Sequence, residues 1–261
     1  MLSVVKGELF KFLRQPLLKI ILFVSLAVVC IQVIPFRQML AELMELEIAF
    51  SEKPTGHNAF VASSFAGFFS FFIPFLVVTV FSSEFTKKTI RNIGTINLPR
   101  RGVFIGKYIS FALMVFFLMF FLAGSSTIVF AIFRGWGSDS IFLDISRILY
   151  YVIISSWREI SYASVLILLT LYIYNDALIV LLYFGLSLIE SIIASVLVSL
   201  SRHVKALTLI AYAFPSSYSH KLTALPVQSG KFAAAVTAMT VSILLTLVLG
   251  STIFKKRDIT V

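Results

Sequence analysis

Three ionisable side chains, Arg158, Glu159 and Glu190, lie inside apolar stretches that are long enough to cross a lipid bilayer. Charged groups in hydrocarbon are costly, and they are usually paired with one another or directed toward a polar pathway. A polar pair at 175–176 separates the two stretches, and a tight helical hairpin about this point places residue 161 opposite Glu190. Arg158 is then about one helical turn, about 5.4 Å, from that level. The spacing predicts an Arg158–Glu190 ion pair, which either fixes the hairpin or faces a transport pathway together with Glu159.

The sequence carries no motif that points to catalysis or to nucleotide binding by this chain. The string nearest to the Walker A pattern is Gly102–Tyr108, which is one residue short and ends in tyrosine. The histidines His57, His203 and His220 are scattered, and Cys30 is the only cysteine. We therefore expect no catalytic residue, no metal site, no intrachain disulfide and no cofactor bound by this chain.

Composition predicts the elements that hold the intramembrane charges. Hydrophobic residues make up 59% of the chain and charged residues 13%, against about 45–50% and about 25% in soluble domains. A helix needs about 20 apolar residues to cross the hydrocarbon core. We therefore expect an all-α integral membrane protein, with one permease-like domain over residues 1–261 and six transmembrane helices. The predicted spans are approximately 17–36, 59–81, 103–133, 150–174, 177–200 and 232–254.

Several segments outside the predicted spans have patterns of their own. Residues 1–16 alternate apolar and basic side chains at helical spacing, which predicts an amphipathic helix at the membrane surface. Residues 82–102 form a basic loop between the second and third spans. The segment 201–231 contains an apolar run too short to cross, so we expect an outer re-entrant or interfacial element there. Pro74 predicts a kink within the second span.

Basic residues indicate how the predicted helices are oriented. The formal net charge of +10 could indicate a nucleic-acid partner, but Lys and Arg in a membrane protein collect at the cytosolic ends of helices. With the N-terminus in the cytosol, most of the 22 Lys and Arg residues fall on the cytosolic side. This pattern predicts a multi-pass protein with both termini in the cytosol, in contact with membrane lipid and without nucleic acid.

The second predicted span is rich in phenylalanine. Phe68, Phe69 and Phe72 belong to this cluster. Two interpretations stay open for them, because large aromatic side chains can pack against other helices and lipid or can line an apolar cavity for an amphipathic substrate.

The loop between the second and third predicted spans has a distinctive order of charged residues and prolines. Its elements are Glu84, Lys88-Thr89-Ile90-Arg91, Pro99-Arg100-Arg101 and Gly106-Lys107. This order resembles the cytosolic loop of ABC-2 type permeases, the membrane subunits of a class of ABC exporters. The beginning of the chain, Glu8–Arg14, resembles the interfacial helix of that family, and the end, Phe254–Ile259, resembles its usual tail. Lys88 departs from the pattern, because glycine is common at that place.

The resemblance implies a half-size, six-span permease whose loop is a coupling helix that docks on a separate ATPase. Its basic side chains would pair with acids of that partner, while Phe85 and Ile90 would fill a groove; the plainer interpretation is a solvated basic loop that only sets topology. The coupling residues that the resemblance implies are Glu84, Phe85, Lys87, Lys88, Thr89, Ile90, Arg91, Pro99, Arg100 and Arg101.

The same resemblance implies the partners and the location of the protein. The partners would be two ABC ATPase subunits, which bind ATP and Mg²⁺, and a second copy of the permease or a related chain. The complex would lie in a bacterial cell membrane and export an amphipathic substrate such as an antimicrobial peptide. Two alternatives from other classes are a membrane-embedded enzyme that uses the three intramembrane charges, and a channel or sensor subunit that works without ATP.

Overall fold

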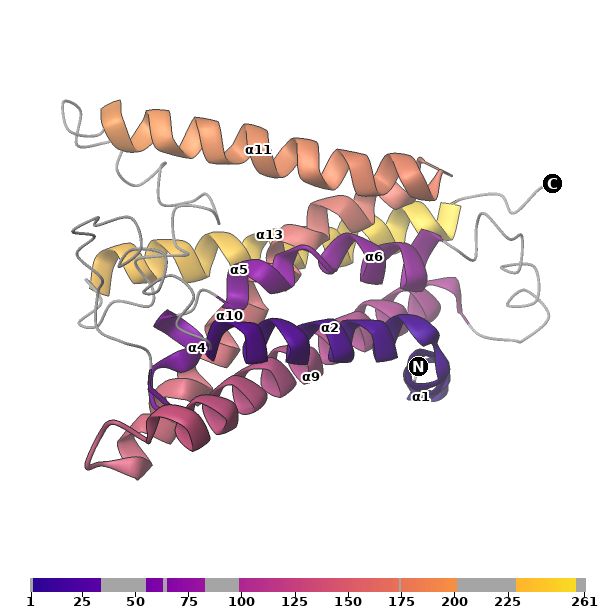
Figure 1. Ribbon diagram of the computed structural model, residues 1–261. Coiled ribbons are helices and arrows are strands. Elements are labelled where there is room, and N and C mark those ends of the chain that lie inside the picture. The colour runs from indigo at the N-terminus through magenta and orange to yellow at the C-terminus, as the bar shows by residue number, and fades with distance from the viewer. Residues whose placement is uncertain are drawn as a thin grey trace. The chain divides into compact units, whose positions relative to one another are not determined.

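The structure is a computed structural model that describes residues 2–33, 55–62, 65–82, 99–173, 175–200 and 229–256. Within these ranges every regular element is a helix, and no strand occurs among them (Figure 1). Five of the described helices are long and apolar enough to cross a membrane, which is the pattern of a multi-pass membrane protein. The predicted all-α class is therefore confirmed for the described part of the chain.

Five predicted spans correspond to long helices. These are α2 (Pro16–Val33), α9 (Arg100–Arg134), α10 (Ile141–Thr170), α11 (Asp176–Leu200) and α13 (Ser229–Lys256). The largest difference between a predicted and an observed helix boundary is at the start of α10, which begins nine residues before the predicted span. Its first turns contain Asp144 and Arg147, which lower hydropathy without preventing a helix.

The segment predicted as the second span is not one continuous helix in the described residues. It consists of α4 (Ala59–Ala62), α5 (Phe65–Ser70), α6 (Ile73–Val77) and the π-helix η1 (Val78–Ser82). A turn at 71–72 separates α5 from α6, and Pro74 is the second residue of α6. Proline lacks an amide proton and its ring collides with the carbonyl four residues earlier, so the helix ends there rather than only bending. The described residues therefore show five long helices and this one broken segment.

The predicted surface helix at the N-terminus is α1 (Leu2–Arg14). Val5, Glu8 and Phe12 are buried at spacings of three and four residues, so they share one face, whereas Leu2 and Phe10 are exposed. The helix stops before Pro16, which is the first residue of α2 and can occupy that place because the first turn needs no amide donor. Glu8 is thus an acid on the buried face of a helix whose other charged residues are basic.

The chain divides into two compact units. The first comprises the described residues within Met1–Phe12, Ser70–Val115 and Ile154–Val261, and the second those within Leu13–Phe69 and Phe116–Ile153. All three intramembrane charges lie in the first unit, which therefore holds the candidate site.

Helix α10 is the common neighbour of α9 and α13 in the first unit. The hydroxyl groups of Tyr108 in α9 and Ser164 in α10 are 2.6 Å apart. Ser242 and Thr246 of α13 donate hydrogen bonds to the carbonyls of Ser161 and Ser164, at 3.2 and 3.3 Å. Such bonds between membrane helices contribute about 0.6 kcal/mol each on average. They hold α9 and α13 against the part of α10 that follows Arg158.

A close approach between α9 and α13 involves Gly250. A Cβ atom at this position would collide with the ring of Phe104. Phe104 also contacts the rings of Phe81 and Phe254, with ring centroids 5.8 and 5.9 Å apart. Small residues at helix interfaces permit this kind of approach in membranes.

Helix α11 packs against α6 and η1 in the same unit (Figure 1). Its start is capped by Asn175, whose side-chain oxygen accepts hydrogen bonds from the amides of Ala177 and Leu178 at 3.0 and 3.2 Å. Helix α10 ends at Thr170 and α11 begins at Asp176, so the predicted polar pair lies at the start of α11, with Asn175 directly before the helix and Asp176 as its first residue.

The second unit contains a turn that joins 55–57 to the residues after α9. The amides of Gly56 and His57 donate to the carbonyls of Gly135 and Trp136, at 3.0 and 3.1 Å. Gly137 has a positive φ of 83°, a conformation that favours glycine. This turn fixes the connection between α9 and α10.

Candidate functional site

Two charged residues of α10, Arg158 and Glu159, form an ion pair with each other. Their side chains are 12% and 3% exposed. Nε of Arg158 donates to Oε1 of Glu159 at 3.1 Å, and a second guanidinium nitrogen contacts the same oxygen. The hydroxyl of Ser70 donates to that oxygen as well, at 2.7 Å. A buried carboxylate with an ion pair and an additional hydroxyl donor is well satisfied, which favours a structural role for Glu159.

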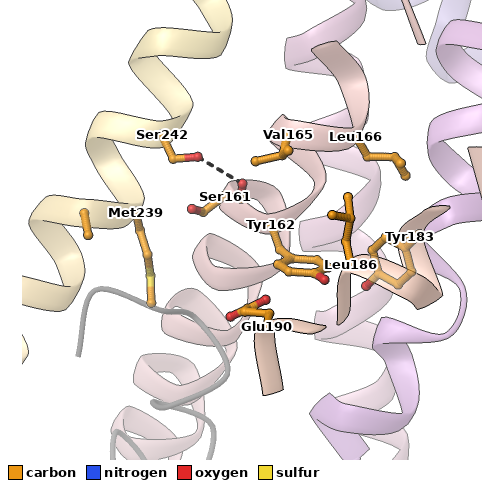
Figure 2. Close-up of a pocket in the computed structure, with 10 residues that line it drawn as sticks. Ser161, Tyr162, Val165, Leu166, Tyr183, Leu186, Glu190, Met239 and Ser242 are labelled. Atoms are coloured by element: carbon orange, nitrogen blue, oxygen red, sulfur yellow. Dashed lines mark hydrogen bonds between the residues drawn. The ribbon is translucent and has the colours of Figure 1, made fainter. Parts of the chain in front are cut away.

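Glu190 lies on α11 and lines a pocket together with Ser161 and Tyr162 of α10 (Figure 2). Ser161 is the residue that the hairpin prediction placed opposite Glu190. Glu190 and the pair Arg158–Glu159 all lie close enough to Tyr183 to interact electrostatically with its phenol. The structure thus brings the three predicted charges into one neighbourhood, while a direct Arg158–Glu190 ion pair stays a prediction.

The pocket has a volume of about 320 Å³ and lies between α10, α11 and α13. Figure 2 shows the carboxylate of Glu190 beside the ring of Tyr162, with Leu186 and Tyr183 near the same ring. The remaining walls are apolar or carry small hydroxyl groups. The lining residues are Ser161, Tyr162, Val165, Leu166, Tyr183, Leu186, Glu190, Ala238, Met239 and Ser242.

The predicted cavity residues of the phenylalanine cluster do not line this pocket. Phe69 and Phe72 are buried, and Phe68 is partly buried. The aromatic wall of the pocket instead comes from Tyr162 and Tyr183, whose ring centroids are 5.1 Å apart in an edge-to-face arrangement. Sequence reasoning missed both tyrosines, although the position of Tyr162 next to the predicted level of Glu190 could have indicated it.

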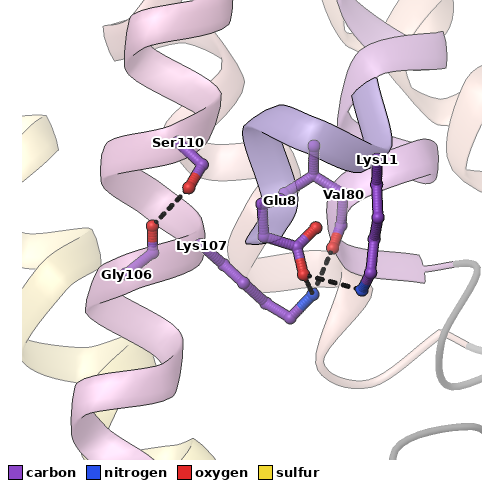
Figure 3. A network of polar contacts seen from close by, with 6 residues as sticks. All are labelled: Glu8, Lys11, Val80, Gly106, Lys107 and Ser110. Atoms are coloured by element: carbon purple, nitrogen blue, oxygen red, sulfur yellow. Dashed lines mark hydrogen bonds and ion pairs between the residues drawn. The ribbon is translucent and has the colours of Figure 1, made fainter. Parts of the chain in front are cut away.

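A second polar group joins α1, η1 and the beginning of α9 (Figure 3). Nζ of Lys107 lies 3.0 Å from Oε1 of Glu8 and donates to the carbonyl of Val80, also at 3.0 Å. Lys11 contacts the same oxygen of Glu8 at 3.1 Å. The side chains of Lys107 and Glu8 are only 4% and 9% exposed, whereas that of Lys11 is 56% exposed.

The burial of Lys107 makes this group a strong local constraint. An ammonium away from water is stable only if nearby acceptors replace its hydration, and Glu8 together with Val80 supplies two. Val80 belongs to η1, and π-helical turns of this kind are frequent at functional sites. The first unit thus fixes α1 to the start of α9 through one buried cation.

A third contact lies where η1 ends. The hydroxyl of Ser82 donates to the carboxylate of Asp176, the first residue of α11. Ser82 is fully buried. The bond therefore ties the last described residue before 83–98 to the start of α11.

The predicted coupling residues Glu84, Phe85, Lys87, Lys88, Thr89, Ile90 and Arg91 lie outside the described residues. Arg100 and Arg101 are the first residues of α9, Pro99 directly precedes them, and all three are exposed. The contacts of Lys107 and Ser82 thus lie on either side of the predicted loop. Neither contact was predicted, although a single acid on the buried face of a basic amphipathic helix is a signal that could have indicated the role of Glu8.

The sequence matches no protein-family model and no curated protein.

Proposed function

We propose that this chain is the membrane subunit of an ABC-2 type exporter, which couples ATP hydrolysis on a separate ATPase to outward transport of an amphipathic or peptide substrate. The pattern of the loop from Glu84 to Lys107 supports this proposal, because it resembles the ABC-2 coupling loop. The observation that carries it is the buried contact of Lys107 with Glu8. This contact attaches the end of that loop to α1. The loop and α1 are the two segments on which a docked ATPase would act.

The contacts on either side of the loop connect it to helices of the first unit. At the first side, Ser82 is bonded to Asp176 and hence to α11. At the second side, Lys107 is bonded to Glu8 and hence to α1. A displacement of the loop by a docked ATPase would therefore move α1, η1, α9 and α11 together. Because α10 and α11 line the pocket with Glu190, such a movement would change the shape of that pocket.

The proposed complex contains two ATPase subunits and two permeases, identical or related. ATP and Mg²⁺ would bind to the ATPases, since this chain has no Walker A sequence. The proposed topology has six spans, the broken segment 59–82 being the second, with both termini in the cytosol of a bacterial cell.

Co-purification tests this proposal. The tagged chain is isolated in mild detergent from the cells that produce it, and the bound proteins are identified by mass spectrometry. We expect a stoichiometric ATPase with a Walker A sequence in the wild type, and its loss in Glu84→Ala and Arg91→Ala. Arg147→Ala is a matched control, because this exposed arginine lies near the start of α10. A chain that purifies without an ATPase in several mild detergents would refute the proposal.

A further inference from the structure

We infer that the pocket between α10, α11 and α13 (Figure 2) is a binding site for an uncharged amphiphile whose polar head donates hydrogen bonds, as a hydroxyl or an amide does. The occupant places this head beside Glu190 and its apolar body against the other walls. As the site of the transported substrate the pocket rests on the proposed function, whereas binding of such a molecule by the isolated chain does not.

The polar groups of the pocket are rich in hydrogen-bond acceptors. Glu190 contributes a carboxyl group, which accepts and does not donate when it is ionised. It is close enough to the phenols of Tyr162 and Tyr183 to interact electrostatically with both. A carboxylate has about four acceptor positions, so it can hold partners in the protein and a donor of the ligand together. The hydroxyl of Ser242 donates its proton to the carbonyl of Ser161 at 3.2 Å, and its oxygen can still accept.

The charges around the pocket favour an uncharged head. Arg158, Glu159 and Glu190 all act on the phenol of Tyr183, so they share one neighbourhood. Arg158 and Glu159 are paired with each other, and Glu190 has contacts of its own in the protein. A charged head would have to leave water and enter a membrane interior, which is costly. A hydroxyl or an amide donates to the same acceptors without that cost.

The rest of the lining suits an apolar body. Leu166, Leu186 and Met239 supply apolar contacts, which are the main lining of sites for small molecules. The rings of Tyr162 and Tyr183, with centroids 5.1 Å apart, add an aromatic wall next to the polar end. The pocket thus has one polar end and apolar sides, the arrangement that an amphiphile requires.

The size and position of the pocket suit a compact molecule from the bilayer. Its volume of about 320 Å³ is near the lower limit of ligand sites, which run from about 300 to 1,000 Å³. Val165 lies on its wall and is 50% exposed, so the pocket reaches the surface at an apolar residue. An amphiphile dissolved in the bilayer can therefore enter without passing through water.

Photolabelling of the chain alone tests the inference. The purified full chain is placed in nanodiscs of phosphatidylcholine, a lipid whose headgroup donates no hydrogen bond, and is irradiated with an octanol that carries a diazirine. The adducts are located by mass spectrometry of the peptides. We expect adducts that saturate with the concentration of the probe and that lie on pocket residues such as Tyr162 and Glu190.

Competitors of equal chain length measure what the head contributes. Octanol, octane and octylammonium are compared at their concentrations in the bilayer. We expect octanol to protect the site at a concentration at least about tenfold lower than octane, equivalent to about 1.4 kcal/mol and near the lower limit for a hydrogen bond to a charged group. Octylammonium should protect less well than octanol. In Glu190→Gln the advantage of octanol over octane should fall to about threefold or less, because hydrogen bonds between neutral groups are about half as strong.

Two matched substitutions on α13 show whether the adducts come from this pocket. Ala238→Leu fills space in the pocket, and we expect it to reduce the adducts. Ala233→Leu makes the same change at an exposed position outside the pocket lining, and it should be labelled like the wild type. Equal protection by octane and octanol, stronger protection by octylammonium, or equal labelling of Ala238→Leu and wild type would overturn the inference. Because the assay uses the chain alone, the absence of an ATPase from the pull-down would refute the proposed function without affecting this result.

Discussion

The buried contact between Lys107 and Glu8 allows a quantitative prediction. Removing one partner of a buried ion pair costs about 3–5 kcal/mol, because the other charge is left without compensation. Lys107 keeps the carbonyl of Val80 as an acceptor, so we expect the lower part of this range for Glu8→Gln, about 3 kcal/mol. Lys107→Met leaves the carboxylate of Glu8 paired with Lys11, whose exposed side chain can move with it. We therefore expect a smaller loss in the free energy of unfolding, about 2 kcal/mol, below the range given above.

The double variant Glu8→Gln with Lys107→Met should cost much less than the sum of the two single changes. Neither charge is then buried, and the replacement of a buried pair by uncharged side chains is often nearly neutral. A double variant that costs about 0–2 kcal/mol gives a coupling energy of about 3–5 kcal/mol, at or above the upper end of the usual range for residues in contact. The free energy of unfolding is measured by titration with dodecyl sulfate in mixed micelles.

Lys11→Met is the control, because it removes a contact to the same carboxylate oxygen from an exposed position. Exposed ion pairs contribute about 0–1 kcal/mol, and we expect a loss in that range. Additive effects of Glu8→Gln and Lys107→Met, or a loss from Lys11→Met as large as that from Lys107→Met, would refute the assignment of a buried pair.

Two other predictions concern a turn and the intramembrane charges. Gly137→Ala should destabilise the protein more than Gly135→Ala. Both glycines have positive φ, which costs alanine about 1–2 kcal/mol. Only at Gly137 would an added Cβ also collide with Thr55, at 2.7 Å from the Cβ of that threonine. Equal unfolding midpoints for the two variants would contradict this prediction. Arg158→Glu and Glu190→Arg should each lower expression and activity, and the double reversal should restore part of both if the two side chains pair; a double variant no better than either single one would show that they do not.

Hydropathy predicted most of the helices, because long apolar runs are sufficient to identify them. It placed the start of α10 too late, since Asp144 and Arg147 in its first turns reduce hydropathy without ending the helix. It also predicted one helix over 59–81, where the turn before Pro74 produces separate short helices. The consequence of that proline was foreseen as a kink, but its extent depends on the packing of α6 and η1 against α11, which a sequence pattern does not contain.

The candidate site was predicted in part. The prediction that residue 161 of α10 lies opposite Glu190 followed from the hairpin, because a tight turn fixes the register of two antiparallel helices. The Arg158–Glu159 pair was not expected, since adjacent residues of a helix do not normally face each other. Glu8 and Lys107 are 99 positions apart, and only the packing of α1 against α9 brings them together. The residue types around Glu8 do not indicate a partner near position 107, and those around Lys107 do not indicate a partner near position 8.

The most direct test of the central claim is whether the loop at 82–102 touches an ATPase. A photo-crosslinking phenylalanine analogue is placed at Phe85, within the predicted coupling segment, and separately at Phe142, an exposed residue near the start of α10 that is 84% exposed. Cells that produce each variant are irradiated, and the adducts are identified by mass spectrometry. We predict an adduct between position 85 and a subunit with a Walker A sequence, and none from position 142. The absence of such an adduct from position 85, or equal adducts from both positions, would contradict the proposal that this chain is driven by an ATPase through that loop.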